Sequence, residues 1–333
     1  MKTLLVTGGC GFIGSAFLRR FVPRHPELRF INLDLLTYAA DPENVAEVAD
    51  APNYQFVHGD VRDRGAVRAL VSESHVDAIV HFAAESHVDR SIEDATAFVS
   101  TNIGGTHALL DAARAKVGTR FVLVSTDEVY GSLSEDAPAT TEDAHLHPGS
   151  PYAAAKAGAD LLAQSYVRTY GLDLSITRCA NNFGPCQFPE KLIPVLVRRA
   201  LAGEQLPMYG NGRNIRDWLH VDDHADAVWA VLHRGVAGRV YNVGADNPRR
   251  NLEIAELVLA HLGLGPDRIA FVTDRPGHDW RYCVDDTRLR TELGWAPQVP
   301  FEAGLRATID WYAQHPLWIE RALARGAATW GPR

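Results

Sequence analysis

Two neighbouring acids, Asp127 and Glu128, follow directly on the apolar stretch RFVLVS (120–125) and Thr126. Carboxyl groups this close in a partly desolvated pocket push their pKa values apart, so that one holds a proton while the other is ionised. Such a pair can supply a general acid and a general base to one reaction. The alternative is a solvated strand end beside the positive end of a helix. Both acids can reach one substrate only if the chain leaves strand geometry after Ser125.

A tyrosine and a lysine, Tyr152 and Lys156, stand four residues apart in the segment SPYAAAKAGADLLAQSY (150–166). The Ser-Pro start predicts a helix, and a spacing of four places both side chains on one helix face. An ammonium beside a phenol lowers the pKa of the phenol, which makes it a usable base toward a hydroxyl group. The pair alone carries little weight, and its position downstream of the acids and of a glycine-rich turn makes it informative.

The glycine-rich turn GGCGFIG follows the apolar segment TLLVT (3–7) and precedes a helical pattern. Gly8, Gly11 and Gly14 form GxxGxxG, where the commoner dinucleotide fingerprint has GxGxxG. The mechanics are the same, because glycine permits a tight turn and lets the backbone approach a pyrophosphate at a helix start. The strand before and the helix after the turn are the context that this motif requires.

Residues at the ends of the next predicted strands complete a dinucleotide site. Asp34 lies 20 residues beyond Gly14, where a carboxylate can accept hydrogen bonds from the ribose hydroxyls of adenosine. A 2′-phosphate would meet like charge there, so NAD is favoured over NADP. Asp60 and Val61 end the third predicted strand and are expected near the adenine. Ala83 and Ala84 end the fourth, where small side chains leave room for the cofactor.

The elements that must position these residues alternate between apolar segments and helical patterns. The predicted strands are residues 3–7, 29–34, 55–60, 78–84, 120–125 and 174–179. Their nearly continuous apolarity fits strands covered on both faces, so we predict an α/β fold with a doubly wound parallel sheet of the Rossmann type.

After Ala180 the chain becomes richer in Gly, Pro, Asn and Arg, with helical patterns at 193–203 and 252–263 and a late strand at 240–244. We expect a smaller α/β C-terminal lobe that binds the substrate. The predicted division is a cofactor-binding domain over residues 1–180, with returning segments near 212–246, and a second lobe formed by 181–211 and 247–333.

Composition excludes several classes of function. The 333 residues carry a formal charge of -8 without a basic run, which argues against nucleic acid as a partner. No apolar run approaches the roughly 18–20 residues that span a bilayer, so we expect no membrane partner. The four cysteines lack paired spacing, and we expect free thiols in a cytoplasmic protein with no metal site.

Six segments together resemble the dTDP-glucose 4,6-dehydratases of the extended short-chain dehydrogenase/reductase family: GGCGFIG, VSTDEVYG, SPYAAAKAGAD, NNFGPCQFPEKLIP, GNGRNIRDWLHVDDH and DRPGHDWRY. The resemblance extends from Met1 to about Leu293. It implies conversion of dTDP-glucose to dTDP-4-keto-6-deoxyglucose, by oxidation at C4, elimination of water across C5 and C6, and reduction at C6 with the same bound NAD.

The resemblance also implies roles. Asp127 would protonate the C6 oxygen and Glu128 would remove the C5 proton, although the residues themselves do not separate these two roles. Thr126 would bond the C4 oxygen, Tyr152 would take the proton of that hydroxyl, and Lys156 would hold the nicotinamide ribose.

The remaining implied contacts form two sets. The cofactor set is Gly8, Gly11, Phe12, Ile13, Gly14, Asp34, Leu36, Thr37, Asp60, Val61, Phe82, Ala83, Ala84, Ser86, Thr101, Tyr152, Lys156 and Asn182. The substrate set is Ser86, Thr126, Asp127, Glu128, Asn181, Glu190, Lys191, Leu192, Pro207, Tyr209, Arg216, Asn251, Arg275 and His278. For Arg216, a diphosphate contact and an ion pair with Asp217 both remain open.

Two alternatives stay open at this point. The chain could be a related nucleotide-sugar enzyme, either a 4-epimerase or a dehydratase of UDP- or GDP-sugars, although an epimerase needs no acid–base pair at C5 and C6. The apolar stripe of the 150–166 helix, including Leu161 and Leu162, could form a homodimer interface, as the resemblance implies, or be buried inside the monomer.

Overall fold

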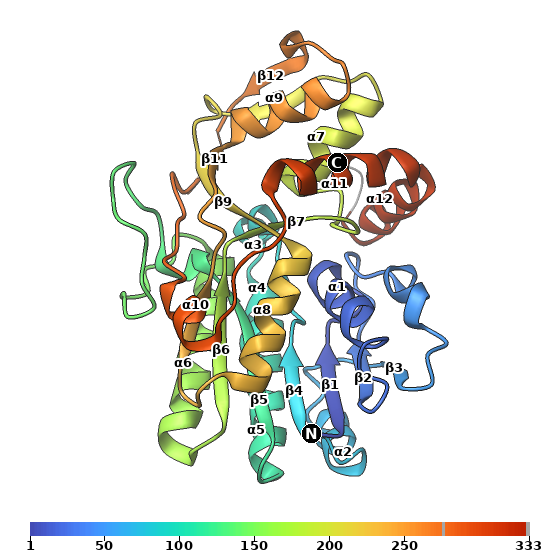
Figure 1. Ribbon diagram of the computed structural model, residues 1–333, viewed down its shortest axis with the longest axis vertical. Coiled ribbons are helices and arrows are strands. Elements are labelled where there is room, and N and C mark those ends of the chain that lie inside the picture. Colours follow the sequence, from blue (N-terminus) through green and yellow to red (C-terminus); the bar gives the residue numbers. More distant parts are fainter. Residues whose placement is uncertain (275–276, 331–333) are drawn as a thin grey trace.

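The computed structural model describes residues 1–274 and 277–330, which contain a seven-stranded sheet (Figure 1). Its order is β10-β6-β5-β4-β1-β2-β3, and every pairing is parallel. The strands are β1 Thr3–Thr7, β2 Arg29–Asp34, β3 Tyr54–His58, β4 Ala78–His81, β5 Arg120–Thr126, β6 Leu174–Cys179 and β10 Val240–Val243. The predicted Rossmann-type fold is confirmed, and the late strand returns to this sheet beside β6.

Helices cover both faces of the sheet, as the apolarity of its strands requires. One face packs against α1 and α8, where Phe17, Leu18 and Val231 are buried, and the other packs against α2, α5 and α6, where Leu109 and Ala163 are buried. The helices of this part are α1 Phe12–Phe21, α2 Arg64–Glu73, α3 Val88–Glu93, α4 Thr96–Phe98, α5 Thr106–Ala115, α6 Pro151–Tyr170, α8 Val221–Arg234 and α10 Thr287–Leu293. Shorter turns are η1 Pro42–Val48, η2 Val99–Gly105 and η3 Asp127–Tyr130.

The third strand departs from the expectation of coverage on both faces. β3 is the last strand of the sheet order, and Gln55, Phe56 and His58 are exposed. An edge strand has a single neighbour, so its apolar residues are covered less completely than those of β1 or β4. The predicted strands over 55–60 and 78–84 also end earlier, at His58 and His81, because the chain turns there toward the functional cleft.

The smaller lobe contains two small sheets and four helices among the described residues. β9 Ile215–His220 pairs with β7 Asn181–Phe183 and β11 Pro248–Arg250, and β8 Leu206–Tyr209 pairs with β12 Ile269–Val272. The helices are α7 Leu192–Leu201, α9 Asn251–His261, α11 Phe301–Gln314 and α12 Pro316–Trp330, and η4 Pro266–Arg268 precedes β12.

The core of the smaller lobe is separate from the two clusters on the large sheet, and it includes Ile193, Ile254 and Trp318. Leu289 and Leu293 of α10 pack in the cluster around α1 and α8 instead, so the chain crosses back to the large sheet a second time. The division at 180, 211 and 246 therefore remains a prediction.

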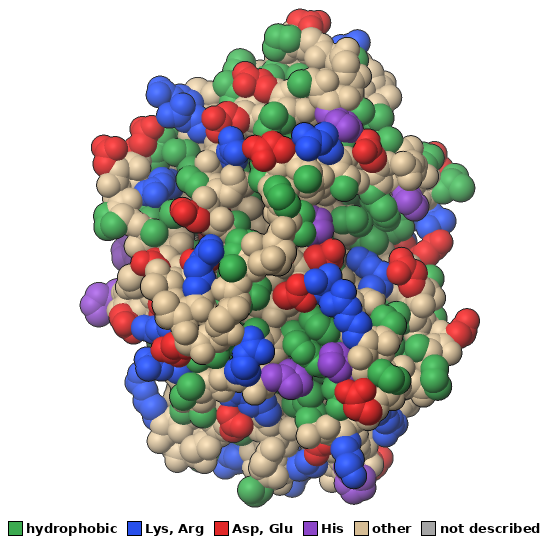
Figure 2. Space-filling model, in the orientation of Figure 1, with side chains coloured by type: hydrophobic (Ala, Val, Ile, Leu, Met, Phe, Trp, Pro, Cys, Tyr) green, Lys and Arg blue, Asp and Glu red, His purple; other side chains and the backbone are tan. Residues whose placement is uncertain are grey.

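The carboxyl ends of the parallel strands point toward the smaller lobe, as the arrowheads of β1 and β4 show in Figure 1. In an open parallel sheet this edge is where ligands bind. Acidic and basic side chains are interspersed over both lobes on the face drawn in Figure 2. No helix within residues 1–274 and 277–330 is both long and apolar enough to cross a membrane.

Candidate active site

A cleft at this edge collects most of the predicted site residues. From the cofactor set it is lined by Gly8, Gly11, Phe12, Ile13, Gly14, Asp34, Thr37, Asp60, Val61, Ala83, Ala84, Ser86, Thr101 and Asn182. From the proposed chemistry it is lined by Thr126, Asp127, Glu128, Tyr152 and Lys156, and from the substrate set by Asn181, Glu190 and Lys191. Segments that are far apart in the sequence therefore meet in one continuous cleft.

The glycine-rich turn lies at the floor of the cleft and is packed too closely for side chains. A Cβ at Gly8 would lie 2.6 Å from the backbone nitrogen of Ala83, and Gly8 has a φ of 72°. A Cβ at Gly14 would lie 2.3 Å from the Gly8 carbonyl oxygen. The start of α1 is thus left bare, with backbone N–H groups available to an anion. This cradle fits the pyrophosphate of a dinucleotide.

The glycine-rich turn is also tied to the end of β2. The side chain of Asn32 accepts a hydrogen bond from Gly9 N at 3.0 Å, and the Asp34 carboxylate accepts one from Cys10 N at 2.8 Å. The other Asp34 oxygen accepts a bond from Leu36 N at 2.8 Å. Each carboxylate oxygen can accept a second hydrogen bond, so Asp34 can still bind ribose hydroxyls.

The two acids lie in a short 3₁₀ turn that begins where β5 ends. Thr126 keeps extended backbone angles, and its hydroxyl oxygen accepts a hydrogen bond from Glu128 N at 3.3 Å. The chain therefore leaves strand geometry one residue later than the predicted point after Ser125. Because the turn replaces the alternation of a strand, Asp127 and Glu128 both line the cleft.

Burial gives Asp127 an unusual protonation state. Its side chain is 3% exposed, and burial raises the pKa of this carboxyl well above its ordinary value, with the charge of Glu128 as the next cause. The Arg216 guanidinium acts in the opposite direction. Among the described residues, the Asp127 Oδ2 atom is buried with no hydrogen-bond partner. The site thus places a carboxyl whose protonated form is favoured by burial beside a second acid.

This raised pKa predicts that Asp127→Asn stabilises the protein progressively as the pH rises. The native state keeps a proton that the unfolded chain releases above the ordinary Asp pKa of 3.8. The wild type therefore loses stability as the pH rises from that value toward the raised native pKa, and the variant does not. Thermal unfolding from pH 4 to pH 8 should show a growing advantage of the variant. The exposed Asp50→Asn variant controls for the loss of one negative charge, and an advantage for Asp127→Asn that stays constant with pH would contradict the prediction.

Helix α6 brings Tyr152 and Lys156 to the same cleft. It begins at Pro151, and the hydroxyl of Ser150 accepts a hydrogen bond from Ala153 N, as expected for a capped helix start. Both side chains are more than nine-tenths buried. The Lys156 Nζ atom donates a hydrogen bond to the Val124 carbonyl at 2.7 Å, which ties the helix to β5.

The expected lowering of the Tyr152 pKa is not what the structure shows. Burial raises the pKa of Tyr152 well above its ordinary value, and the charge of Glu128 raises it further, while a hydrogen bond with Thr126 acts in the opposite direction. Lys156 is itself buried, which lowers its own pKa, and its ammonium is directed to the Val124 carbonyl. The four-residue spacing predicted a shared helix face and could not predict this desolvation.

Some predicted residues do not line the cleft. The side chains of Leu36 and Phe82 pack against the core cluster on the large sheet and neither residue lines the cleft, so their cofactor contacts stay predictions. The substrate-set residues that lie beyond the cleft lining are Leu192, Pro207, Tyr209, Arg216, Asn251 and His278. Arg275 lies outside the described residues.

Arg216 and His278 lie outside the cleft lining, and polar contacts hold both side chains. The Arg216 guanidinium lies 4.5 Å from the ring centroid of Tyr282 and donates a hydrogen bond to the Asp279 carbonyl at 2.9 Å. The Asp217 carboxylate instead accepts bonds from the backbone of the segment 245–247. His278 bonds to Asp274 at 2.6 Å. Arg216 is thus held by carbonyl groups and an aromatic ring, close enough to lower the pKa of Asp127.

Sequence reasoning missed several residues of the cleft. Asn102 bonds both backbone polar groups of Glu85, at 2.9 Å and 3.0 Å, and so fixes the loop after β4. Asn102 itself does not line the cleft, and the missed lining residues include Arg62, Glu85, Cys179, Ala180, Gln187 and Phe188. Cys179 ends β6, so its position at the carboxyl end of a parallel strand was a signal that could have identified it.

Comparison with known proteins gives one consistent result. The family model described as GDP-mannose 4,6 dehydratase matches residues 5–308. A dTDP-glucose 4,6-dehydratase of Streptomyces niveus is 50% identical over 334 residues, covering 99% of this chain and 98% of the relative.

Solved structures agree. The dTDP-glucose 4,6-dehydratase DesIV of Streptomyces venezuelae, solved with NAD and a second ligand, aligns with a TM-score of 0.92 and 49% identity over 96% of this chain and 99% of the other. The enzyme of Bacillus anthracis in complex with NAD aligns with a TM-score of 0.91 and 42% identity over 97% and 100% of the two chains.

Proposed function

Since the chain belongs to the NAD-dependent epimerase/dehydratase family, within the extended short-chain dehydrogenases/reductases, we propose that it converts dTDP-glucose to dTDP-4-keto-6-deoxyglucose and water. The activity is that of a hydro-lyase which uses NAD without net consumption. The observation that carries the proposal is the meeting of two unlike pairs in one cleft. Tyr152 and Lys156 serve oxidation and reduction, and Asp127 and Glu128 serve elimination.

Oxidation at C4 depends on groups from β5 and α6. Bound NAD, held by the glycine-rich turn and Asp34, would supply the hydride acceptor for C4 and the hydride donor for C6. Tyr152 takes the proton of the C4 hydroxyl, and Thr126, which is close enough to influence the pKa of Tyr152, orients the C4 oxygen. Lys156 supplies a positive charge behind Tyr152 and binds the nicotinamide ribose. Asn182 belongs to the nicotinamide side, where its carbonyl side-chain oxygen bonds His224 at 2.9 Å.

Elimination depends on the unequal protonation of the two acids. A ketone at C4 makes the C5 proton acidic, Glu128 removes that proton, and Asp127 donates its own proton to the departing C6 hydroxyl. The raised pKa of Asp127 supports its role as the acid, because burial favours the protonated form of this carboxyl. Glu128 is less buried than Asp127 and lines the cleft, so its carboxylate is accessible to a bound sugar.

The nucleotide end of the substrate extends toward the smaller lobe. Asn181 and Ser86 contact the sugar and diphosphate, while Glu190 and Lys191 lie on the wall of the cleft. Arg216 binds the diphosphate because its planar fork suits phosphate oxygens. The more distant Asn251, Tyr209 and His278 belong to the nucleotide-base side.

A turnover assay tests the function directly. Purified protein is incubated with dTDP-, UDP- and GDP-glucose, and the 4-keto product is detected by its absorbance in alkali and by mass. We expect dTDP-glucose to lose one water and the other two sugars to react much more slowly. Release of a dTDP-hexose of unchanged mass would indicate a 4-epimerase, and preferred turnover of UDP- or GDP-glucose would contradict the dTDP assignment.

We further propose a homodimer formed through α6. The side chain of Leu161 is 58% exposed, and the neighbouring elements η2 and α3 expose Val99 and Ile92. Leu162 packs on the core cluster under α6, so only the Leu161 side of the predicted stripe faces outward. Light scattering should give twice the mass of the 36.5 kDa chain, and Leu161→Glu should shift the protein toward that single-chain mass. A monomeric wild type would contradict the proposal.

The four buried, free cysteines suit the reducing cytoplasm, where we place the enzyme.

A further inference from the structure

A buried polar network centred on Arg178 lies beside the catalytic cleft, and Arg178 is the register partner of the lining residue Ser125. Arg178 of β6 is 2% exposed and forms an ion pair with the fully buried Asp160, with 2.8 Å between Nε and Oδ2. Its Nη1 atom donates a hydrogen bond to the hydroxyl of Tyr130 at 2.9 Å. One guanidinium thus joins two segments that are 30 residues apart in the sequence.

Both partners of Arg178 stand on elements that carry catalytic residues. Tyr130 is the last residue of the turn η3, which begins with Asp127 and Glu128. Asp160 lies on α6, one helical turn beyond Lys156 on the same face. Tyr130 also packs with Ala157 of α6 in a small apolar cluster. The network therefore connects the turn that carries the elimination pair to the helix that carries the hydride-transfer pair.

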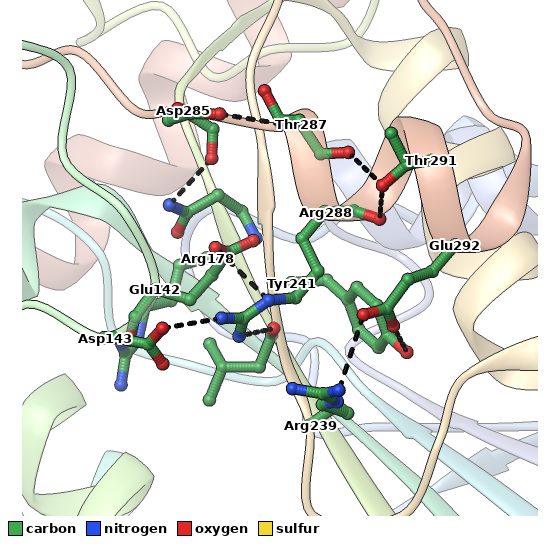
Figure 3. A network of polar contacts seen from close by, with 12 residues as sticks. Glu142, Asp143, Arg178, Arg239, Tyr241, Asp285, Thr287, Arg288, Thr291 and Glu292 are labelled. Atoms are coloured by element: carbon green, nitrogen blue, oxygen red, sulfur yellow. Dashed lines mark hydrogen bonds and ion pairs between the residues drawn. The ribbon is translucent and has the colours of Figure 1, made fainter.

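Further contacts hold Tyr130 from the other side. Its hydroxyl donates to the Asn242 side-chain oxygen at 2.7 Å, and Asn242 N donates to Glu142 at 3.0 Å. Figure 3 shows Arg288 reaching from α10 to Glu142 and Asp143, with the Asp143 contact at 2.9 Å. The position of the Tyr130 hydroxyl is consequently determined by a donor and an acceptor that are both fixed by rigid elements.

We propose that Arg178 is a positioning residue which sets the distance between Asp127 and Glu128 on η3 and Tyr152 and Lys156 on α6. The inference rests on the proposed function. Oxidation and elimination act on adjacent carbons of one sugar, so the two pairs must be held in register to within a fraction of an ångström. A buried ion pair is weak support for stability alone, because desolvation offsets its attraction. The fork of Arg178 instead provides geometry, since it bonds two elements at fixed angles.

The experiment uses Tyr130→Phe, which removes one hydroxyl while keeping the ring and the Arg178–Asp160 pair. The matched control is Tyr166→Phe. Tyr166 lies on α6 like Tyr152 but does not line the cleft, and its hydroxyl bonds to Asp111 of α5 at 2.5 Å. Steady-state turnover of dTDP-glucose, single-turnover absorbance of the reduced nicotinamide and thermal unfolding are measured for both variants and the wild type.

We expect Tyr130→Phe to lower kcat roughly 10- to 100-fold with KM changed less than about twofold, since misplacement by a fraction of an ångström affects the chemical step rather than binding. Oxidation still relies on α6 while the acids on η3 lose their register, so reduced nicotinamide should accumulate in a single turnover. Tyr166→Phe should behave like the wild type. Arg178→Lys, which keeps the charge but not the two-directional fork, should show the same accumulation.

Three results would overturn the proposal. One is a kcat for Tyr130→Phe within about twofold of the wild type. Another is a loss of activity with no accumulation of reduced nicotinamide. The third is a loss of kcat in Tyr130→Phe that is accompanied by a larger fall in the thermal midpoint than Tyr166→Phe shows. That result would make the network merely structural. Failure of the proposed function itself is seen separately, as a wild type that releases no 4-keto product from dTDP-glucose.

Discussion

Replacement of Glu128 by Gln is expected to lower turnover of dTDP-glucose by about 10²–10⁴-fold, the range typical of lost general-base catalysis. An amide cannot accept the C5 proton, while oxidation at C4 by the Tyr152 side of the cleft proceeds. Reduced nicotinamide should therefore form in a single turnover and persist, because its hydride can return to C6 only after elimination. Rapid mixing with dTDP-glucose, followed by absorbance of the reduced cofactor and hydrogen exchange at C5, measures both steps.

The change has a second consequence that sharpens the test. The charge of Glu128 is one of the causes that raise the pKa of Asp127, so its removal lowers that pKa toward the ordinary value. Glu135→Gln is a suitable control, because it makes the same chemical change in a solvent-exposed pair with Arg250 and should leave turnover unaltered. A Glu128→Gln enzyme that still releases the 4-keto product at the wild-type rate would refute the assignment of Glu128 as the base.

Replacement of Tyr152 by Phe should give a comparable loss of turnover, about 10²–10⁴-fold, with the opposite spectral result. The phenol is the group placed to remove the C4 hydroxyl proton, so without it the hydride is not released and no reduced nicotinamide forms. Bound NAD, measured after denaturation of the purified protein, should equal that of the wild type, because the glycine cradle and Asp34 are untouched.

The pair of variants therefore separates the two halves of the reaction. Accumulation of reduced nicotinamide in Glu128→Gln and its absence in Tyr152→Phe would assign elimination to η3 and hydride removal to α6. Tyr166→Phe again controls for the loss of a phenol on the same helix. Formation of reduced nicotinamide by Tyr152→Phe at the wild-type rate would contradict the role of Tyr152.

Local sequence was sufficient to predict the fold class and the cradle for the cofactor. The periodicity of apolar residues identified β1, β2, β5 and β6 closely, because continuous apolarity reports a strand covered on both faces. Gly8 and Gly14 were recognisable because no other residue fits where their Cβ atoms would meet backbone. Asp34 and the two acids could be predicted from their positions at strand ends, since all strands of a parallel sheet present their carboxyl ends at one edge.

The protonation states and the rigid frame of the site depended on tertiary structure alone. Spacing placed Tyr152 beside Lys156 on one helix face, yet the pKa of Tyr152 is raised because segments distant in the sequence bury it beside Glu128. Sequence alone left the roles of Asp127 and Glu128 open, and the unequal burial of the two acids supports the proposal that Asp127 is the acid. Arg178 had no motif to mark it, since the positioning role proposed for it depends on two elements that meet only in the folded chain. The desolvation of a side chain and the distance between two catalytic elements both depend on all the residues packed around them. Neither can be derived before the positions of those residues are known.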